Sequence, residues 1–255
     1  MRALEANLAR VRDRIAGAAA RAGRDAAEVR IVAVTKGFGP EAVALAAAVG
    51  LTDIGENRVK DAARKRATGT AGTTFPSGGA DRATTEPTGL VWHLIGHLQT
   101  NKALEAAEIF DRIHTVDSRR VADALDVAGE RLGKNLTVLV QVKTSDEAAK
   151  SGVAPGMAAD LVAYVAARRH LAVEGLMTVP AYTADPEGAR PFFRILRQLR
   201  DEIGAQTGLD LPELSMGMSH DFEVAVEEGA TWVRLGTALF GERPGLSLPV
   251  SPAAP

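Results

Sequence analysis

Eight short strand-like runs alternate with helix-like segments along the 255 residues, and no second cluster of strands interrupts them. The expected strands are residues 31–36, 51–55, 90–96, 110–116, 137–142, 171–179, 213–216 and 232–235. This count and order favour an α/β fold with a single (β/α)8 TIM-type barrel over an open sheet, because such barrels take about 250 residues. Leu4, Leu8, Val11 and Ile15 recur at helical spacing and predict an additional N-terminal helix.

Two stretches fall outside this alternation. Residues 67–89 are dominated by Thr, Gly, Ser and Pro without apolar periodicity, which predicts a flexible insertion loop. The end of the chain is rich in Pro, Ser and Ala, and we expect residues 244–255 to form a disordered tail. Residues 1–243 are therefore expected to form one domain.

Charge and composition exclude several classes of protein. The net charge of −2 favours neither nucleic acid nor an anionic membrane, and the cluster Arg64-Lys65-Arg66 is interpreted as a solvated helix face. The absence of cysteine removes disulfides and thiolate chemistry. No apolar run approaches the roughly 20 residues of a membrane span, and the charged N-terminus lacks a secretory signal. We expect a cytoplasmic protein.

Lys36 ends the first strand-like run, immediately before Gly37-Phe38-Gly39-Pro40. The carboxyl ends of barrel strands carry the chemistry of this fold, so the position of this lysine is informative. A lysine there is either a solvated strand end or a desolvated amine. A desolvated amine has a lowered pKa and can form a Schiff base with an aldehyde.

Two loops near the end of the chain are rich in Gly and hydroxyl groups. They are residues 215–219 after the seventh strand and Gly236-Thr237 after the eighth. Barrels commonly build a phosphate site from these two loops, where backbone N–H groups and hydroxyls can approach the anion. Each loop alone is also typical of ordinary turn chemistry. Together with Lys36 they favour a phosphate-bearing aldehyde.

Several motifs resemble the pyridoxal phosphate homeostasis proteins, which are similar to the barrel domain of alanine racemase (PLP fold type III). The resemblance extends from about residue 5 to 243 and includes residues 34–36, 55–57, 92–96, 98–102, 150–152, 175–177, 214–219 and 233–237. It implies that Lys36 holds pyridoxal 5′-phosphate (PLP) as a Schiff base. It also implies that Ser215, Gly236 and Thr237 line the phosphate, that Arg234 faces the pyridine nitrogen, and that Asn57 lies beside the cofactor.

The same resemblance implies a non-catalytic role in intracellular vitamin B6 homeostasis, with storage, buffering or delivery of PLP to apo PLP-dependent enzymes. A protonated Arg234 would leave the pyridine nitrogen unprotonated and weaken its function as an electron sink. Racemases of this fold add a tyrosine from a second domain, which we expect to be absent here. Tyr164 lies in a helix pattern and Tyr182 follows the sixth strand. We therefore assign no catalytic residue. We also expect a monomer.

Other interpretations stay open at this point. A PLP-dependent amino-acid racemase, or a Schiff-base aldolase, would use the same lysine. Residues 37–42 fit the loose G-x-G-x-x-A pattern of nucleotide-binding sheets, although an eighth strand then has no role. His93 and His97 have ligand-like spacing but no nearby carboxylates, so we expect packing or surface histidines and no metal site.

Overall fold

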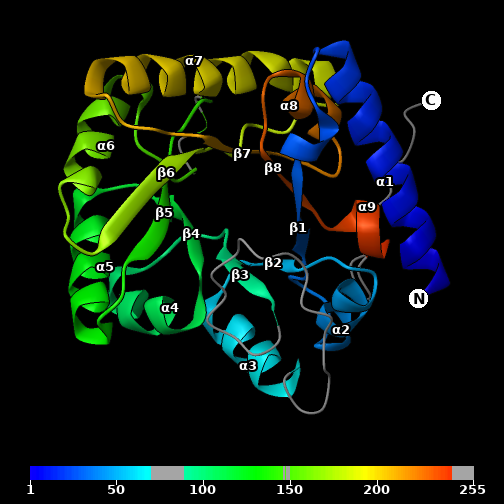
Figure 1. The fold of residues 1–255 in the computed structure, drawn as a ribbon, viewed down its shortest axis with the longest axis horizontal. Coiled ribbons are helices and arrows are strands. Elements are labelled where there is room, and N and C mark those ends of the chain that lie inside the picture. Colours follow the sequence, from blue (N-terminus) through cyan, green and yellow to red (C-terminus); the bar gives the residue numbers. More distant parts are fainter. Residues whose placement is uncertain (70–88, 146, 148–149, 243–255) are drawn as a thin grey trace, which may run out of the picture.

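The computed structural model describes residues 1–69, 89–145, 147 and 150–242. Within this part of the chain, parallel strands follow one another in sequence order and close into a barrel, with β8 paired to β1 (Figure 1). The strands are β1 (Arg30–Val34), β2 (Asp53–Glu56), β3 (Val91–Leu94), β4 (Arg112–Val116), β5 (Leu136–Gln141), β6 (Leu171–Met177), β7 (Glu213–Met218) and β8 (Trp232–Leu235). The predicted barrel is confirmed, and the closed sheet excludes the open, doubly wound sheet that the G-x-G-x-x-A interpretation of residues 37–42 assumed.

Helices surround the barrel (Figure 1). They are α1 (Arg2–Arg21), α2 (Glu41–Ala48), α3 (Val59–Gly69), α4 (Ala103–Ile109), α5 (Arg119–Leu132), α6 (Ala158–Ala166), α7 (Arg190–Thr207), α8 (Phe222–Glu227) and α9 (Thr237–Phe240), with 3₁₀ turns η1 (Ala26–Glu28), η2 (Thr100–Lys102), η3 (Pro155–Met157) and η4 (Pro186–Ala189). The predicted N-terminal helix is α1. It buries Leu4, Leu8, Val11 and Ile15 and packs against α8 and α9. No helix in the described residues is long and apolar enough to cross a membrane.

Some predicted boundaries differ from the structure. Strand β1 stops at Val34, so Thr35 and Lys36 belong to the turn that follows it. Helix α3 continues through Gly69, three residues into the stretch expected to be an irregular loop, and the Thr68 hydroxyl donates a hydrogen bond to the Arg64 carbonyl. The rest of the predicted insertion, 70–88, and the predicted tail, 244–255, lie outside the described residues.

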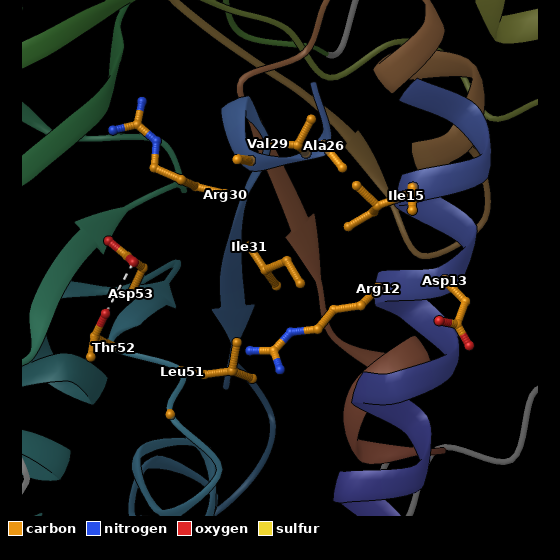
Figure 2. Close-up of a pocket in the computed structure, with 13 residues that line it drawn as sticks. Arg12, Asp13, Ile15, Ala26, Val29, Arg30, Ile31, Leu51, Thr52 and Asp53 are labelled. Atoms are coloured by element: carbon orange, nitrogen blue, oxygen red, sulfur yellow. Dashed lines mark hydrogen bonds between the residues drawn. The ribbon is translucent and has the colours of Figure 1, made fainter. Parts of the chain in front are cut away.

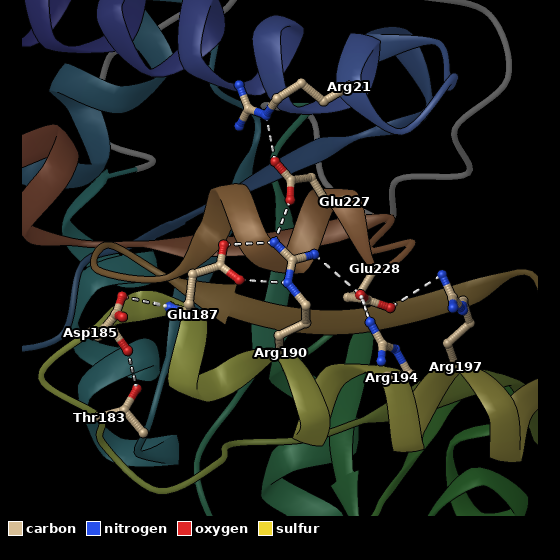
Figure 3. Close-up of polar contacts among 9 residues, drawn as sticks. All are labelled: Arg21, Thr183, Asp185, Glu187, Arg190, Arg194, Arg197, Glu227 and Glu228. Atoms are coloured by element: carbon tan, nitrogen blue, oxygen red, sulfur yellow. Dashed lines mark hydrogen bonds and ion pairs between the residues drawn. The ribbon is translucent and has the colours of Figure 1, made fainter.

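An ionic cluster ties the N-terminal helix to the outside of the barrel (Figure 3). Arg190, at the start of α7, contacts Glu187 at 2.6 Å, Glu227 at 2.6 Å and Glu228 at 3.2 Å. Arg21 of α1 reaches the other oxygen of Glu227 at 2.6 Å. We call this the Arg190 cluster, and it consists of Arg21, Glu187, Arg190, Arg194, Arg197, Glu227 and Glu228.

Candidate functional site

A cavity of about 310 Å³ lies at the carboxyl ends of the strands. Its walls are Val34, Lys36, Asn57, Ile95, Val179, Met218, Ser219, Arg234, Gly236 and Thr237. The structure thus brings together five of the six residues that the sequence singled out: Lys36, Asn57, Arg234, Gly236 and Thr237. The sixth, Ser215, does not line the cavity.

Lys36 is half-buried on the cavity wall, directly after an anchored residue. The backbone N–H of Thr35 donates to the Gly55 carbonyl at 3.1 Å, and its hydroxyl donates to Glu56 Oε1 at 2.5 Å. Beyond Lys36, the Phe38 ring packs on the Phe240 ring of α9, with centroids 5.2 Å apart. The turn that carries Lys36 is therefore fixed on both sides, which limits the positions that its amine can reach.

A fully buried ion pair supports this turn. Lys65 Nζ donates to Glu56 Oε1 at 2.5 Å and to the Thr35 carbonyl at 2.6 Å, and both charged side chains are 1% exposed. The prediction of a solvated face at Arg64-Lys65-Arg66 is wrong for Lys65. Periodicity placed this residue on α3 but could not show that α3 turns it toward β2. Buried charges of this kind are retained only when they are paired, as these two are.

Asn57 lines the cavity, and its side chain carries an unsatisfied acceptor. Its Oδ1 is buried and accepts no hydrogen bond within the described part of the chain. Its backbone is packed against Gly96, where a Cβ atom would lie 2.3 Å from the Asn57 carbonyl oxygen. Any larger residue at position 96 would thus displace Asn57. A buried, unpaired acceptor in a cavity wall is a group for which a ligand can supply the missing donor.

The loops after β7 and β8 meet at one side of the cavity. The Ser219 hydroxyl accepts hydrogen bonds from the backbone N–H groups of Gly236 at 3.2 Å and Ala238 at 3.1 Å. Gly217 has a φ of +88°, and a Cβ there would lie 2.6 Å from the Cβ of Ala225, so this turn requires glycine. The two N–H groups donate to Ser219 Oγ in this structure, and an anion seated at that position would take the place of the hydroxyl as their acceptor.

Arg234 is a buried cation in the cavity wall. Its Nη1 donates to Ser215 Oγ and its Nη2 to the Thr178 carbonyl, both at 2.8 Å, and the residue is 4% exposed. Burial lowers the pKa of Arg234 to about 10, partly opposed by the charge of Asp221. The guanidinium therefore keeps its proton at neutral pH while contacting only neutral acceptors among the described residues.

Of the two serines in the predicted loop 215–219, the structure places Ser219 and not Ser215 on the cavity wall. Ser215 is buried in the barrel interior beneath Arg234, whereas Ser219, three residues after the end of the predicted seventh strand, reaches the cavity. Strand β7 runs through Met218, two residues beyond its predicted end, which moves the loop and its hydroxyl along the chain. A longer strand estimate would have identified Ser219.

The two tyrosines lie away from the cavity. Tyr182 is 77% exposed, and its ring stacks near His220 with centroids 5.3 Å apart. The Tyr164 hydroxyl donates to Asp123 Oδ1 at 2.8 Å, on the outer helices α5 and α6. Neither residue lines the cavity in the described structure.

Comparison with known proteins gives consistent matches over nearly the whole chain. The family model of the alanine racemase N-terminal domain matches residues 2–244. A pyridoxal phosphate homeostasis protein of Aquifex aeolicus (strain VF5) is 40% identical over 236 residues, covering 92% of this chain and 96% of the relative. A protein of the same name from Pseudomonas aeruginosa is 40% identical over 243 residues, covering 95% and 97%.

Solved structures agree with these matches. PipY of Synechococcus elongatus PCC7942, determined with PLP bound, has a TM-score of 0.77 at 33% identity and covers 93% of this chain and 100% of its own. An alanine racemase of Clostridium difficile 630 in complex with cycloserine has a TM-score of 0.71 at 16% identity. The latter match covers 96% of this chain but 60% of the racemase, and it shows a shared fold.

Proposed function

The chain belongs to the family of pyridoxal phosphate homeostasis proteins, and from this membership and the cavity geometry we propose that it binds PLP and acts in PLP homeostasis. In this role it holds the cofactor covalently on Lys36 without turning over a substrate. The observation that carries the proposal is the meeting of Lys36, Arg234 and an anion-donor loop in one cavity.

The cavity walls fit the functional groups of PLP. When bound, PLP supplies an aldehyde for a Schiff base, a pyridine nitrogen and a phosphate. We assign Lys36 to the aldehyde and Arg234 to the pyridine nitrogen. We assign Ser219, Gly236 and Thr237 to the phosphate, because all three line the cavity and the Gly236 N–H and the Ser219 hydroxyl are already in contact there. Ser215 would act on the phosphate only through this loop, since Arg234 occupies its hydroxyl.

The same walls argue for binding without turnover. Racemisation on PLP needs a second placed acid/base group besides the lysine. Among the described residues that line the cavity, Lys36 and Arg234 are the titratable ones. Arg234 stays protonated at neutral pH and would therefore hold a pyridine nitrogen without donating a proton to it. A site built in this way holds the cofactor without the groups that would carry it through a reaction.

Release requires recipients, and we propose apo PLP-dependent enzymes in that role. This step follows from the family rather than from a contact in the structure. The expected cytoplasmic location and monomeric state stay predictions.

The proposal is tested by titrating the purified protein with PLP, reducing it with borohydride and mapping the modified peptide by mass spectrometry. We expect the wild-type protein to carry the adduct on Lys36 and Lys36→Ala to carry none. Lys143→Ala is the matched control, because Lys143 is half-buried at the carboxyl end of β5 but does not line the cavity. An adduct on another lysine in the wild-type protein would refute the assignment.

Amino-acid racemisation is measured on the same preparations. We expect the PLP-loaded protein to show no turnover above free PLP. Racemisation that disappears with Lys36→Ala would identify the racemase instead and refute the non-catalytic part of the proposal.

A further inference from the structure

A continuous chain of hydrogen bonds crosses the barrel interior from the cavity to the opposite end of the strands. Arg234 Nη1 contacts Ser215 Oγ at 2.8 Å, and Ser215 Oγ contacts His114 Nδ1 at 2.9 Å. His114 Nε2 then contacts His93 Nδ1 at 2.9 Å, and His93 Nε2 contacts Asp53 Oδ1 at 3.1 Å. The five residues come from β8, β7, β4, β3 and β2, and none is more than 5% exposed.

The carboxylate end of this chain and the neutral state of its two rings fix its direction. A guanidinium can only donate and an ionised carboxylate can only accept. With both rings neutral, His93 Nε2–H donates to Asp53, His114 Nε2–H donates to His93 Nδ1, and Ser215 donates to His114 Nδ1. Burial lowers the pKa of both His93 and His114, which keeps the rings neutral as this arrangement requires. Every proton in the chain then points toward Asp53.

The far end of the chain lies beside solvent-accessible space. Asp53 borders a groove of about 540 Å³ at the amino ends of β1 and β2, where α1 and η1 also contribute walls. Figure 2 shows its carboxylate accepting a second hydrogen bond, from the Thr52 hydroxyl at 3.3 Å. The Asp53 carboxylate is thus held at the amino end of the barrel, and the Arg234 guanidinium, at the other end of the hydrogen-bond chain, lines the cavity.

Packing alone does not account for these groups. The His93 ring lies 5.0 Å from the Trp232 ring, so apolar side chains could fill the same space without the cost of burying polar atoms. What the polar chain adds is an orientation for Arg234. Because the Ser215 proton is committed to His114, a lone pair of Ser215 stays directed at the guanidinium, and polarisation along the chain strengthens that contact.

We propose that Asp53, His93 and His114 are positioning residues for the cofactor site, and that they hold the Arg234 guanidinium in the orientation that binds the pyridine ring of PLP. This inference rests on the proposed function. It extends the site from the cavity wall to the opposite end of the barrel, three hydrogen bonds beyond Ser215.

Two substitutions of His114 separate positioning from packing. His114→Asn places an amide oxygen where Nδ1 was, so Ser215 keeps an acceptor while His93 loses its donor. His114→Gln places its amide where Nε2 was, so His93 keeps its donor while Ser215 loses its acceptor. We expect His114→Gln to raise the dissociation constant for PLP about tenfold and His114→Asn only about threefold, because only His114→Gln removes the acceptor of the Ser215 proton.

The absorption maximum of bound PLP gives a readout that loss of packing would not move. It reports the surroundings of the pyridine ring, so we expect His114→Gln to shift it and His114→Asn to leave it closer to the wild-type position. Asp53→Asn tests the far end and should raise the dissociation constant about threefold. His170→Gln is the control, because His170 is half-buried outside the barrel interior and should leave both readouts unchanged.

The outcomes distinguish the inference from the proposed function. If wild-type protein forms the Lys36 adduct while both His114 variants keep its affinity and absorption maximum, the positioning role is refuted and the proposed function stands. Equal losses in both His114 variants, with equally lowered thermal stability, would also refute it in favour of packing. Failure of the wild-type protein to bind PLP would remove the proposed function itself.

Discussion

The half-buried Arg190 and the buried Arg234 have opposite kinds of partner for their positive charges. Arg190 lies among three carboxylates, and its hydrogen bonds to Glu187, Glu227 and Glu228 raise its pKa above the ordinary arginine value (Figure 3). Arg234 is more deeply buried but donates to a hydroxyl and a carbonyl, and burial lowers its pKa to about 10. One cation is neutralised by the protein, and within the described residues the other is not.

This contrast separates a structural arginine from a binding one. A charge that is desolvated without an ion-pair partner costs stability, and such a cost persists where a ligand can offset it. The Arg190 cluster joins α1, α7 and α8 and borders no part of the cavity, whereas Arg234 forms part of the cavity wall. The two sites should therefore respond differently to the same substitution.

The largest effect is expected from Arg234→Met. Losing the guanidinium should weaken PLP binding about 100-fold, equivalent to about 2.7 kcal/mol, because a buried charged contact is removed. The free energy of unfolding of the cofactor-free protein should not fall by more than about 1 kcal/mol, since no ion pair is broken. PLP titration and urea unfolding measure the two quantities. A large loss of cofactor-free stability would mean that Arg234 is structural after all.

The same substitution at the other site should reverse this pattern. Arg190→Met leaves Glu227 and Glu228 with fewer partners, and we expect the free energy of unfolding to fall by about 2 kcal/mol. PLP affinity should stay unchanged. Arg200→Met, which removes an arginine on the same helix paired with the mostly exposed Asp201, is the control and should cost less than about 0.5 kcal/mol. Equal losses at Arg190 and Arg200 would show that the cluster contributes nothing special.

Sequence periodicity predicts the order of strands and helices, and the regions that depend on this order were predicted well. Alternation of strands and helices predicted the barrel, and the residues 232–235 expected as the last strand are the bounds of β8. Position at a strand end then predicted that Lys36, Asn57 and Gly236 would lie on one side of the barrel, because the barrel brings all such ends together, whereas Arg234 was expected from the family resemblance. These features depend on the order of elements and need no knowledge of side-chain contacts.

Contacts between elements were beyond the same reasoning. Lys65 looked like any solvated lysine on a helix, and only the approach of α3 to β2 makes it a buried partner of Glu56. His93 was expected to be a packing or surface residue, although its Nδ1 lies 2.9 Å from His114 Nε2 on the neighbouring strand. Register between β3 and β4 creates that contact, and a pattern of apolar residues does not specify register closely enough to reveal it.

The hydrogen-bond chain from Arg234 to Asp53 and the Arg190 cluster should lose their contributions to the free energy of unfolding at different pH values. His93 and His114 have lowered pKa values in the folded protein, so protons bind preferentially to the unfolded chain once the pH falls below about 6.5. The contribution of the two neutral histidines to the free energy of unfolding is thus full above that pH. Below it, this contribution falls by up to about 1.4 kcal/mol per pH unit for each proton. The charged groups that face the two rings are Asp53, Asp111, Arg112, Arg30 and Arg234.

Carboxylates of the Arg190 cluster respond at lower pH. Burial raises the pKa of Glu227, but hydrogen bonds from Arg190 and Arg21 outweigh it and lower the pKa overall, so its contribution is lost only below about pH 4.5. Urea unfolding between pH 5 and 7.5, at about half-unit steps, measures the difference. His93→Gln should flatten the dependence of the free energy of unfolding on pH in this range, and Arg190→Met should leave it unchanged. An unchanged slope in His93→Gln would contradict this account.

Salt should produce the smallest effect, and on one region only. The arginines of the Arg190 cluster are partly exposed, with Arg190 at 24% and Arg194 at 51%, so its ion pairs are open to screening. At about 1 M NaCl, where the Debye length is about 3 Å, we expect the stability difference between wild type and Arg190→Met to shrink by about 0.5 kcal/mol. The difference between wild type and His93→Gln should stay constant, because those groups are fully buried. Equal salt dependence at both sites would mean that the cluster is as shielded from solvent as the barrel interior, and the contrast between the two arginines would then rest on their partners alone.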